Sequence, residues 1–364
     1  MTHPKSDWLL SAPVSATNKK AETPLFPYLA RLMRGEDLSV SDAAKFFQAL
    51  TDVNANPAQI AAALTALTAK GETFEELAGM AGVMRSQAVS IKAPGKFAVD
   101  ITGTGSSPSK TFNVSTAAAL VAAGAGLMIA KQSNRGVTSS CGSADLLGEL
   151  GVEVAGEPAI AQTSLSGAGL CFLFAPKFHP HLRRVGDIRS SLGIRTCLNV
   201  LGVLANPAGV SRQLVGVWHR SLVEPVAKAL ALLKTDLAWV VHGEDGLDEI
   251  TLTGKTFVGA VSGTEVRPYT ISPADFGIKP GSIEHLREKS AKESAKIIRD
   301  VLASQRRDEA RSLIVLNAAA ALVVGGLATD PMHAARLAEQ SIDSGMAQNK
   351  LERLVQVTNK KVNS

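Results

Sequence analysis

The stretch DITGTGSSPSKTFNVST, residues 100–116, decides the fold. Apolar residues precede the glycines in FAVDIT (97–102), and small apolar residues follow in STAAALVAAGAG (115–126), as expected of a buried strand and a helix. Between them, Gly103 and Gly105 allow positive φ angles and close approach of the backbone to a ligand. The first N–H groups of a helix have no partner within it, so this turn suits a phosphate or pyrophosphate.

The glycine loop, GTGSSPSKT (103–111), is not a Walker A loop, because Ser109 stands where that motif places a glycine before its lysine. It is not a GxGxxG turn either, because Pro108 occupies the third glycine position. A glycine turn before a helix is often purely structural. The loop alone therefore leaves both interpretations open.

Strand and helix patterns alternate after Pro94. The strand-like segments are FAVDIT (97–102), LMIA (127–130), LCFLFA (170–175) and LAWVVHG (237–243). This alternation predicts an α/β fold with a mostly parallel central sheet. Ligands of such sheets gather at the carboxyl ends of the strands. The loops expected there are GTGSSPSKT, KQSNRG (131–136), APKFHP (175–180) and HGEDGLDE (242–249).

The residues before this region have helical signals. These are Ser41 before DAAKFFQAL, Asn56-Pro57 at the start and Gly71 at the end of a second helix, and a capping box of Thr73 with Glu76. The sequence thus predicts a small all-helical domain hinged to a large α/β domain. The expected parts are a flexible tail (1–24), the helical domain (25–95, joined by about 178–207) and the α/β domain (96–177 and 208–364).

Composition narrows the function classes. The chain has 364 residues, a formal charge of +5 and a pI near 9.1, but it has no long Lys/Arg block, so nucleic acid is not the expected partner. Three scattered cysteines and the absence of a signal peptide favour the reducing cytoplasm. The longest apolar run, residues 313–328, is interrupted by Asn317 and two glycines, which favours a buried helix over a membrane span.

Two further loops carry charges suited to a phosphorylated substrate. Lys131 and Arg135 could neutralise a phosphate, and Asn134 could donate to a carbonyl or carboxylate. The acids of HGEDGLDE, which are Glu244, Asp245, Asp248 and Glu249, could bind Mg²⁺ together with substrate phosphates. Taken alone, the first loop could be an ordinary polar loop, and the acids could be exposed residues at a helix start.

Three other residues of interest have no partner in the sequence. His179 and His181 lack a third ligand at metal-site spacing, so packing or stacking is expected of His179. Cys141 has no recognisable base, so it is not expected to be a nucleophile.

Taken together, the motifs resemble the anthranilate phosphoribosyltransferase family over about residues 24–357. The matching segments are DITGTG, TFNVSTAAALVAAGAG, K..NR, GSADLLGELGV, FLFAPKFHP, SLGIRT, HGEDGLDEIT, LNAAAALVVGG and AEQSIDSGMA. The resemblance implies a homodimer that forms through its helical part. It also implies Mg²⁺-dependent transfer of phosphoribose from phosphoribosyl pyrophosphate (PRPP) to the amine of anthranilate, a step of tryptophan biosynthesis.

The resemblance also implies roles for single residues. Those implied to bind the substrates are Gly103, Gly105, Ser106, Ser107, Thr111, Asn113, Ser115, Thr116, Lys131, Asn134, Ser139, Ser143, His179 and Arg189. Lys131, Asn134 and Arg189 are the implied catalytic residues, and Arg189 would pair with the carboxylate of the acceptor. Ser115, Asp248 and Glu249 are the implied Mg²⁺ ligands.

The chain departs from the family pattern in the same loops. Ser106-Ser107 replaces the Gly-Asp of GTGGD, Gln132-Ser133 replaces the His-Gly of KHGNR, and Val203 replaces the proline of LLGPL. Gln132 cannot carry a proton as histidine can. Two alternatives therefore stand beside the main interpretation: a related transferase or phosphorylase with another aromatic or nucleobase acceptor, and a non-catalytic relative that binds nucleic acid.

Overall fold

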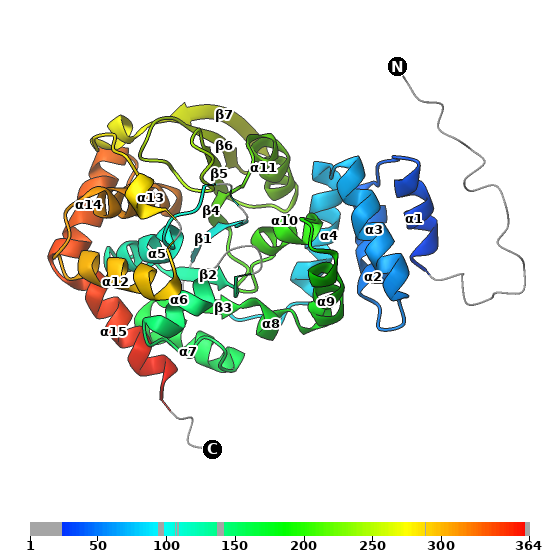
Figure 1. Cartoon of the computed structure of the whole chain (residues 1–364), viewed down its shortest axis with the longest axis horizontal. Coiled ribbons are helices and arrows are strands. Elements are labelled where there is room, and N and C mark those ends of the chain that lie inside the picture. Colours follow the sequence, from blue (N-terminus) through cyan, green and yellow to red (C-terminus); the bar gives the residue numbers. More distant parts are fainter. Residues whose placement is uncertain are drawn as a thin grey trace, which may run out of the picture. The chain divides into compact units, whose positions relative to one another are not determined.

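The computed structural model describes residues 24–93, 98–105, 107, 109–136, 142–287 and 289–360 (Figure 1). Ser106, Ser139, Cys141 and the predicted tail up to residue 23 lie outside these ranges. The chain divides into two compact units. The first comprises residues 1–87 and 181–201, and the second comprises residues 88–180 and 202–364.

The first unit is helical. Its helices are α1 (Phe26–Met33), α2 (Val40–Thr51), α3 (Pro57–Lys70), α4 (Phe74–Ser86) and α9 (Arg183–Leu192), and α10 (Cys197–Leu204) begins in it. Helix α2 packs against α4, and α3 packs against α1 and α9. The structure confirms Asn56 as the cap of α3 and the Thr73–Glu76 capping box of α4. The cap expected at Ser41 was wrong, because Ser39 accepts the N–H of Asp42 and the helix starts at Val40.

The second unit contains a seven-stranded sheet in the order β3-β2-β1-β4-β5-β6-β7. The strands are β1 (Val99–Gly103), β2 (Ile129–Ser133), β3 (Leu170–Phe174), β4 (Arg212–Gly216), β5 (Leu237–Gly243), β6 (Thr256–Ser262) and β7 (Glu265–Ile271). All pairs from β3 to β5 are parallel, and β6 and β7 are added antiparallel at the β5 edge. The mostly parallel sheet is therefore confirmed, while β4, β6 and β7 had not been recognised in the sequence.

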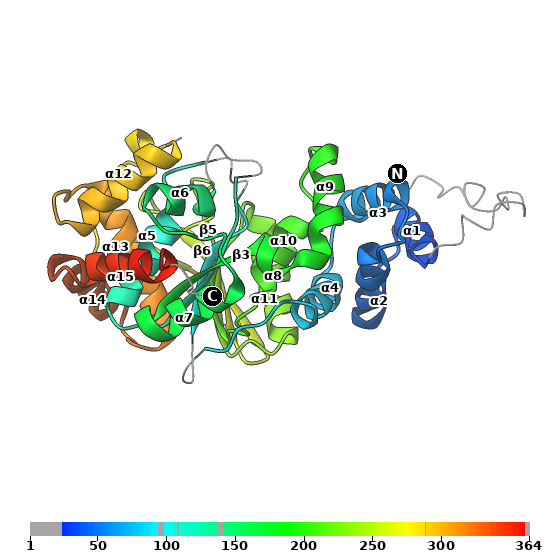
Figure 2. The ribbon, with the colours of Figure 1, turned by 90° about the horizontal axis from the view of Figure 1, so that it is seen from below.

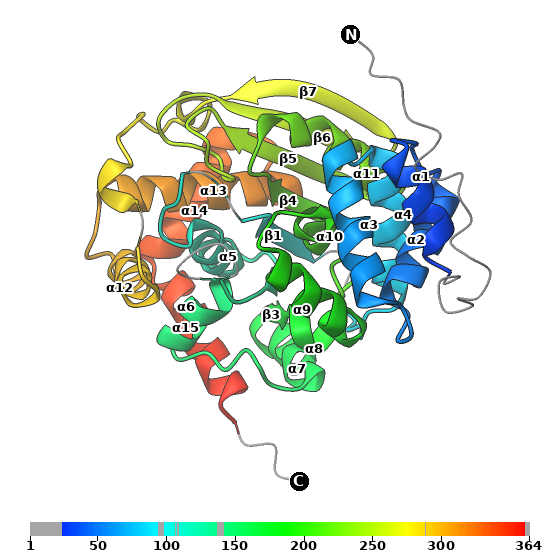
Figure 3. The same cartoon turned by 45° about the vertical axis from the view of Figure 1, so that its right-hand side comes forward.

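Helices cover both faces of this sheet. They are α5 (Val114–Gly124), α6 (Ser143–Glu149), α7 (Pro158–Ala168), α8 (Ala175–Phe178), α11 (Val223–Leu232), α12 (Ala291–Leu302), α13 (Glu309–Gly325), α14 (Pro331–Asp343) and α15 (Met346–Thr358). Helices α5 and α13 pack together against β1 and β4, whereas α11 packs against β5 and β6 on the opposite face (Figure 3). Figure 2 shows α12 to α15 grouped beside α5.

The strand order places a switch point at β1. The chain runs outward from β1 to β2 and β3, then crosses back so that β4 pairs with the other side of β1. Ligands of open α/β sheets bind at the carboxyl ends of the strands beside such a point. The last residues of the two central strands, Gly103 and Gly216, are paired in register there.

The apolar run of residues 313–328 lies mostly in α13, which is buried along most of its length. In the part of the chain that the structure describes, no helix is long and apolar enough to cross a membrane.

Candidate functional site

The loop after β5 closes over the ends of the two central strands. A Cβ atom added to Gly216 would lie 1.7 Å from the backbone oxygen of Asp248, and one added to Gly103 would lie 2.7 Å from its carboxylate. Only glycine leaves room for this contact. The close approach brings the metal loop, residues 244–251, against the switch point.

The glycine loop holds the Asp248 carboxylate directly. Gly105 has a φ of +63°, a left-handed conformation that favours glycine, and its N–H donates to Asp248 Oδ2 at 2.9 Å. Thr104 ties the loop to β4, because its N–H donates to the Gly216 carbonyl at 2.9 Å. The start of the glycine loop is thus fixed on both sides.

The Lys131 side chain extends from β2 toward the N-terminus of α5. Its side chain is 2% exposed, and its Nζ donates to the Ile101 carbonyl and, at 3.2 Å, to Ser115 Oγ. Ser115 is the one residue of α5 that is not buried. The Ser115 backbone N–H and the Lys131 charge both act to lower the pKa of Glu249, so the Glu249 carboxylate lies near them. Lys131, Ser115 and Glu249 therefore meet at the N-terminus of α5.

Burial dominates the electrostatics of this cluster. It raises the pKa of Asp248, and burial together with the Asp248 charge raises the pKa of Glu249 to about 8. Burial also lowers the pKa of Lys131, against the opposing effect of the nearby acids. The two neighbouring carboxyls lack enough positive charge around them to be ionised at their usual pH.

Two carboxylates and a hydroxyl at one strand edge fit Mg²⁺. Mg²⁺ prefers oxygen ligands, and it uses few protein carboxylates where substrate phosphates complete its coordination. A cation beside Glu249 would favour its ionised form and oppose the burial that raises its pKa. Asp248, Glu249 and the Ser115 hydroxyl are thus suited to hold the ion.

Two buried polar side chains support the cluster from behind. Asp100 is fully buried, and its carboxylate accepts from the Gln132 N–H at 3.2 Å and from Asn206 Nδ2 at 2.8 Å. Burial raises the pKa of Asp100 to about 6. In α13, Asn317 pairs with both backbone groups of Ile250, at 2.9 and 3.0 Å, and so fixes the end of the metal loop.

A second group of predicted residues lies where β2 leads into α6. The Asn134 N–H donates to Ser143 Oγ at 3.2 Å, and the Asn134 carbonyl accepts from Ala144. Asp145 accepts the N–H groups of Gly136 and Gly142 and joins both ends of this loop. The Asn134 side chain is exposed, and its Oδ1 accepts from the Arg135 N–H.

The remaining predicted residues are more spread out. Thr111 forms an isolated bridge with Arg287, Asn113 precedes α5, and Thr116 is fully buried within it. His179 follows α8 and is buried. Arg189 lies in α9 of the first unit, where burial lowers the pKa of its guanidinium. The predicted Ser106 and Ser139 lie outside the described residues.

The residues that depart from the family pattern differ in their surroundings. Gln132 and Ser133 end β2, and their buried Nε2 and Oγ atoms have no hydrogen-bond partner within the described structure. Ser107 is also buried, but its hydroxyl lies against the carbonyls of Ser109 and Gly246.

Several residues of the site were missed in the sequence. Gly216 could not be found because β4 had not been recognised. Asp100, Asn206 and Asn317 act through contacts 67 to 106 residues away, which no local pattern reveals.

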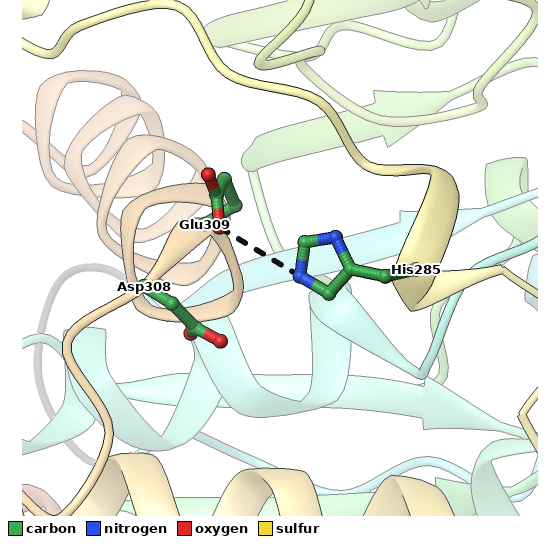
Figure 4. Close-up of side chains that lie close together, drawn as sticks. All are labelled: His285, Asp308 and Glu309. Atoms are coloured by element: carbon green, nitrogen blue, oxygen red, sulfur yellow. Dashed lines mark ion pairs between the residues drawn. The ribbon is translucent and has the colours of Figure 1, made fainter.

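A third group of possible ligands consists of His285, Asp308 and Glu309 (Figure 4). Glu309 faces His285 with a nitrogen–oxygen distance of 3.7 Å. Asp308 is already engaged, because it caps α13 and pairs with Arg306 at 2.6 Å. We interpret this group as a helix cap with surface ion pairs.

Family models match two consecutive stretches of the chain. Residues 26–88 match the helical bundle domain, and residues 95–348 the a/b domain, of a glycosyl transferase family. The anthranilate phosphoribosyltransferase of Clostridium kluyveri is 43% identical over 331 residues, which covers 91% of this chain and 98% of that protein.

Solved structures agree as well. The crystal structure of the Thermus thermophilus anthranilate phosphoribosyltransferase has a TM-score of 0.85 and 34% identity, and covers 91% of this chain and 99% of that one. The Saccharomyces cerevisiae enzyme in complex with PRPP and Mg has a TM-score of 0.84 and 28% identity, with 93% and 99% coverage.

Proposed function

The chain belongs to the anthranilate phosphoribosyltransferase family, and from this premise we propose that it transfers phosphoribose from PRPP to the amine of anthranilate, with Mg²⁺ as cofactor. The products are phosphoribosylanthranilate and pyrophosphate. The observation that carries the proposal is the meeting of the glycine loop, Lys131 and the Asp248–Glu249 pair at the switch point. This cluster combines positive charge for an anion, from Lys131 and the N-terminus of α5, with carboxylates for a metal ion.

The chemistry that such a site must support is departure of pyrophosphate from the sugar carbon. Mg²⁺, when bound, supplies positive charge that stabilises the departing pyrophosphate. The Lys131 ammonium and the positive end of the α5 helix dipole stabilise developing negative charge in the same region. The bond from the sugar carbon to the pyrophosphate oxygen breaks, the amine nitrogen forms the new bond to that carbon, and the nitrogen then gives up one proton, which the departing pyrophosphate can accept. An aromatic amine needs little deprotonation before this attack, so Gln132 in place of histidine is compatible with turnover.

Positioning of the acceptor falls to two groups. Arg189 would pair with the anthranilate carboxylate, and Asn134 is the second residue expected to bind the acceptor. Support comes from the exposed Asn134 side chain and from the partly buried Arg189, whose lowered pKa reflects a guanidinium withdrawn from water.

The direct test is turnover. Pure protein is incubated with Mg²⁺, PRPP and anthranilate, and the loss of anthranilate fluorescence is followed. We expect PRPP-dependent loss of fluorescence that EDTA abolishes. Absence of turnover at high enzyme concentration would overturn the assignment of the acceptor.

A second candidate, transfer to another aromatic or nucleobase acceptor, is favoured by one observation. The unpaired Nε2 of Gln132 and Oγ of Ser133 offer hydrogen-bonding groups at the end of β2. A buried polar atom without a partner is costly, so an acceptor with complementary groups would gain affinity there. A panel of acceptors assayed for pyrophosphate release separates the two candidates, and selective turnover of a nucleobase would favour the second.

We also propose that the protein is a cytoplasmic homodimer that acts in tryptophan biosynthesis. The helical unit exposes the apolar side chains of Phe26, Met33 and Val40, which suit a contact between copies. The buried free thiols of Cys171 and Cys197 are consistent with a reducing compartment. Sedimentation equilibrium of the wild type and of a Met33→Glu variant tests the dimer, which the variant is expected to weaken.

A further inference from the structure

Two serines of the glycine loop are buried and directed at the metal loop. Ser107 is 4% exposed, and its hydroxyl lies within hydrogen-bond distance of the Gly246 carbonyl and, at 2.7 Å, of the Ser109 carbonyl. Ser109 is 8% exposed, and its hydroxyl donates to the Asp245 carbonyl at 2.6 Å. These contacts bridge segments about 136 to 139 residues apart in the sequence. The two residues are referred to as the serine pair.

The carbonyls that accept these bonds belong to a firmly held turn. The Asp245 carboxylate accepts from Thr251 Oγ1 at 2.5 Å, from Thr253 Oγ1 at 3.1 Å and from the Leu247 N–H at 3.2 Å. A turn braced in this way moves as one body. The position of the Asp245 and Gly246 carbonyls therefore determines where Asp248 and Glu249 lie.

We infer that the serine pair positions the metal loop against the glycine loop, so that binding of PRPP and binding of Mg²⁺ are coupled through these two hydroxyls. This inference rests on the proposed function. The Gly105 N–H also joins these two loops through its bond to Asp248. That donor belongs to the backbone, whereas the hydroxyls of the serine pair belong to side chains. The serines are positioning residues: their hydroxyls are spent on protein carbonyls.

The chemistry at these positions requires a donor. A carbonyl oxygen accepts a hydrogen bond, so serine and threonine can satisfy it, whereas alanine leaves it without a partner in a buried place. The contacts of Ser107 also explain why serine can stand at the position where the family pattern has aspartate. A carboxylate at this position could not donate to the carbonyls that the Ser107 hydroxyl meets.

The experiment measures binding separately from turnover. PRPP is titrated calorimetrically into the full-length protein at fixed MgCl2 without an acceptor, and MgCl2 is titrated at fixed PRPP. The variants are Ser107→Ala, Ser109→Ala and the double variant, with Ser109→Thr as the conservative replacement. Ser164→Ala is the matched control, because it removes an equally buried hydroxyl whose partner, the Ile160 carbonyl, lies in its own helix α7.

We expect each alanine variant to weaken both PRPP and Mg²⁺ binding about tenfold, the size of effect that one lost buried hydrogen bond can produce. Ser109→Thr should bind like the wild type, and so should Ser164→Ala. The Tm of the single variants should stay close to that of the control. Unchanged binding in the double variant overturns the inference, as does equal weakening in Ser164→Ala or failure of Ser109→Thr to retain binding.

Two further measurements distinguish a failure of this inference from misfolding of a variant and from a failure of the proposed function. If the double variant does not fold, Ser107→Cys, which keeps the size but donates weakly, should give an intermediate loss, and wild-type binding would contradict the inference. If the wild type binds PRPP with Mg²⁺ but does not consume anthranilate, the acceptor assignment fails while the binding test of the serine pair still stands.

Discussion

The N–H of Gly105 donates to the carboxylate of Asp248 at 2.9 Å, and this bond joins the loop after β1 to the loop after β5. Close approach at Gly216 makes it possible, because the backbone oxygen of Asp248 lies where any other residue would carry its Cβ atom. The two glycines and the acid therefore form one geometric unit. The first prediction tests this unit.

Gly216→Ala should displace the metal loop, because its new Cβ would lie 1.7 Å from the Asp248 oxygen. A misplacement of about 1 Å in a catalytic site can lower activity about 100-fold, and we expect a loss of at least that size in kcat/KM. Gly167→Ala is the control, since nothing lies within 4 Å of its added Cβ in helix α7. Its activity should be unchanged, and its stability should rise by about 0.5–1 kcal/mol. Normal activity of Gly216→Ala would contradict the geometry described here.

Lys131→Met should impair PRPP use. It removes the buried ammonium group that contacts Ser115 and lies near both metal-loop acids. We expect kcat/KM for PRPP to fall roughly 100- to 1,000-fold, as for loss of one preorganised electrostatic donor. Lys177→Met, which removes an exposed ion pair with Glu157, serves as the control. Equal kinetics of the two variants would exclude a role for Lys131.

Arg189→Lys should affect binding of the acceptor, anthranilate, without affecting binding of the donor substrate, PRPP. Lysine keeps the charge but loses the planar fork that matches a carboxylate. We expect the KM for anthranilate to rise about tenfold while the KM for PRPP stays constant. Arg183→Lys, at an exposed position of the same helix α9, should behave like the wild type. If only the KM for PRPP rises, Arg189 binds PRPP and not anthranilate.

Asp100 should give stability a distinct pH dependence. Its folded-state pKa of about 6 lies above the ordinary value of 3.8, because burial disfavours the ionised form. The unfolded chain therefore binds fewer protons between about pH 4 and 6, and the free energy of unfolding falls as the pH rises through this window. Two pKa units correspond to roughly 3 kcal/mol. Asp100→Asn should reduce this slope in denaturant titrations without abolishing it, because burial also raises the pKa of Asp248, and an identical slope in the variant would refute the assignment.

The thiols of Cys171 and Cys197 should be unreactive in the native protein. Both are buried, and burial raises the pKa of each well above its usual range, so the reactive thiolate is scarce. In a Cys141→Ser background, a disulfide reagent should label neither thiol until the protein is unfolded in guanidinium. Rapid labelling without denaturant would show that these thiols are accessible.

The parts of the fold that have local signals could be predicted from the sequence. Asn56, Pro57 and the Thr73–Glu76 pair define helix starts within a few residues, and the apolar strand LAWVVHG matches β5 in full. Strand β4 was missed because RQLVG begins with two polar residues and is too short to stand out. Strand β7 was missed because it is largely exposed at the edge of the sheet.

The candidate site shows the same limit. Motif resemblance led to Lys131, Ser115, Asp248 and Glu249, which the structure brings together. Ser107 had been interpreted through the aspartate that it replaces, whereas its contacts depend on Gly246, which is distant in the sequence. Side chains that act through non-local partners have no pattern of their own in the sequence.

The two loops of the site are separated by 143 residues along the chain, and Asn317 secures the second of them from a further 67 residues away. A chain still on the ribosome therefore lacks half of the site until β5 has emerged, and lacks its support until α13 has followed. Closing such long loops is slow and comes late in folding. Chains that stop before α13 will not capture substrate, and bound PRPP will stabilise only molecules whose synthesis has passed α13.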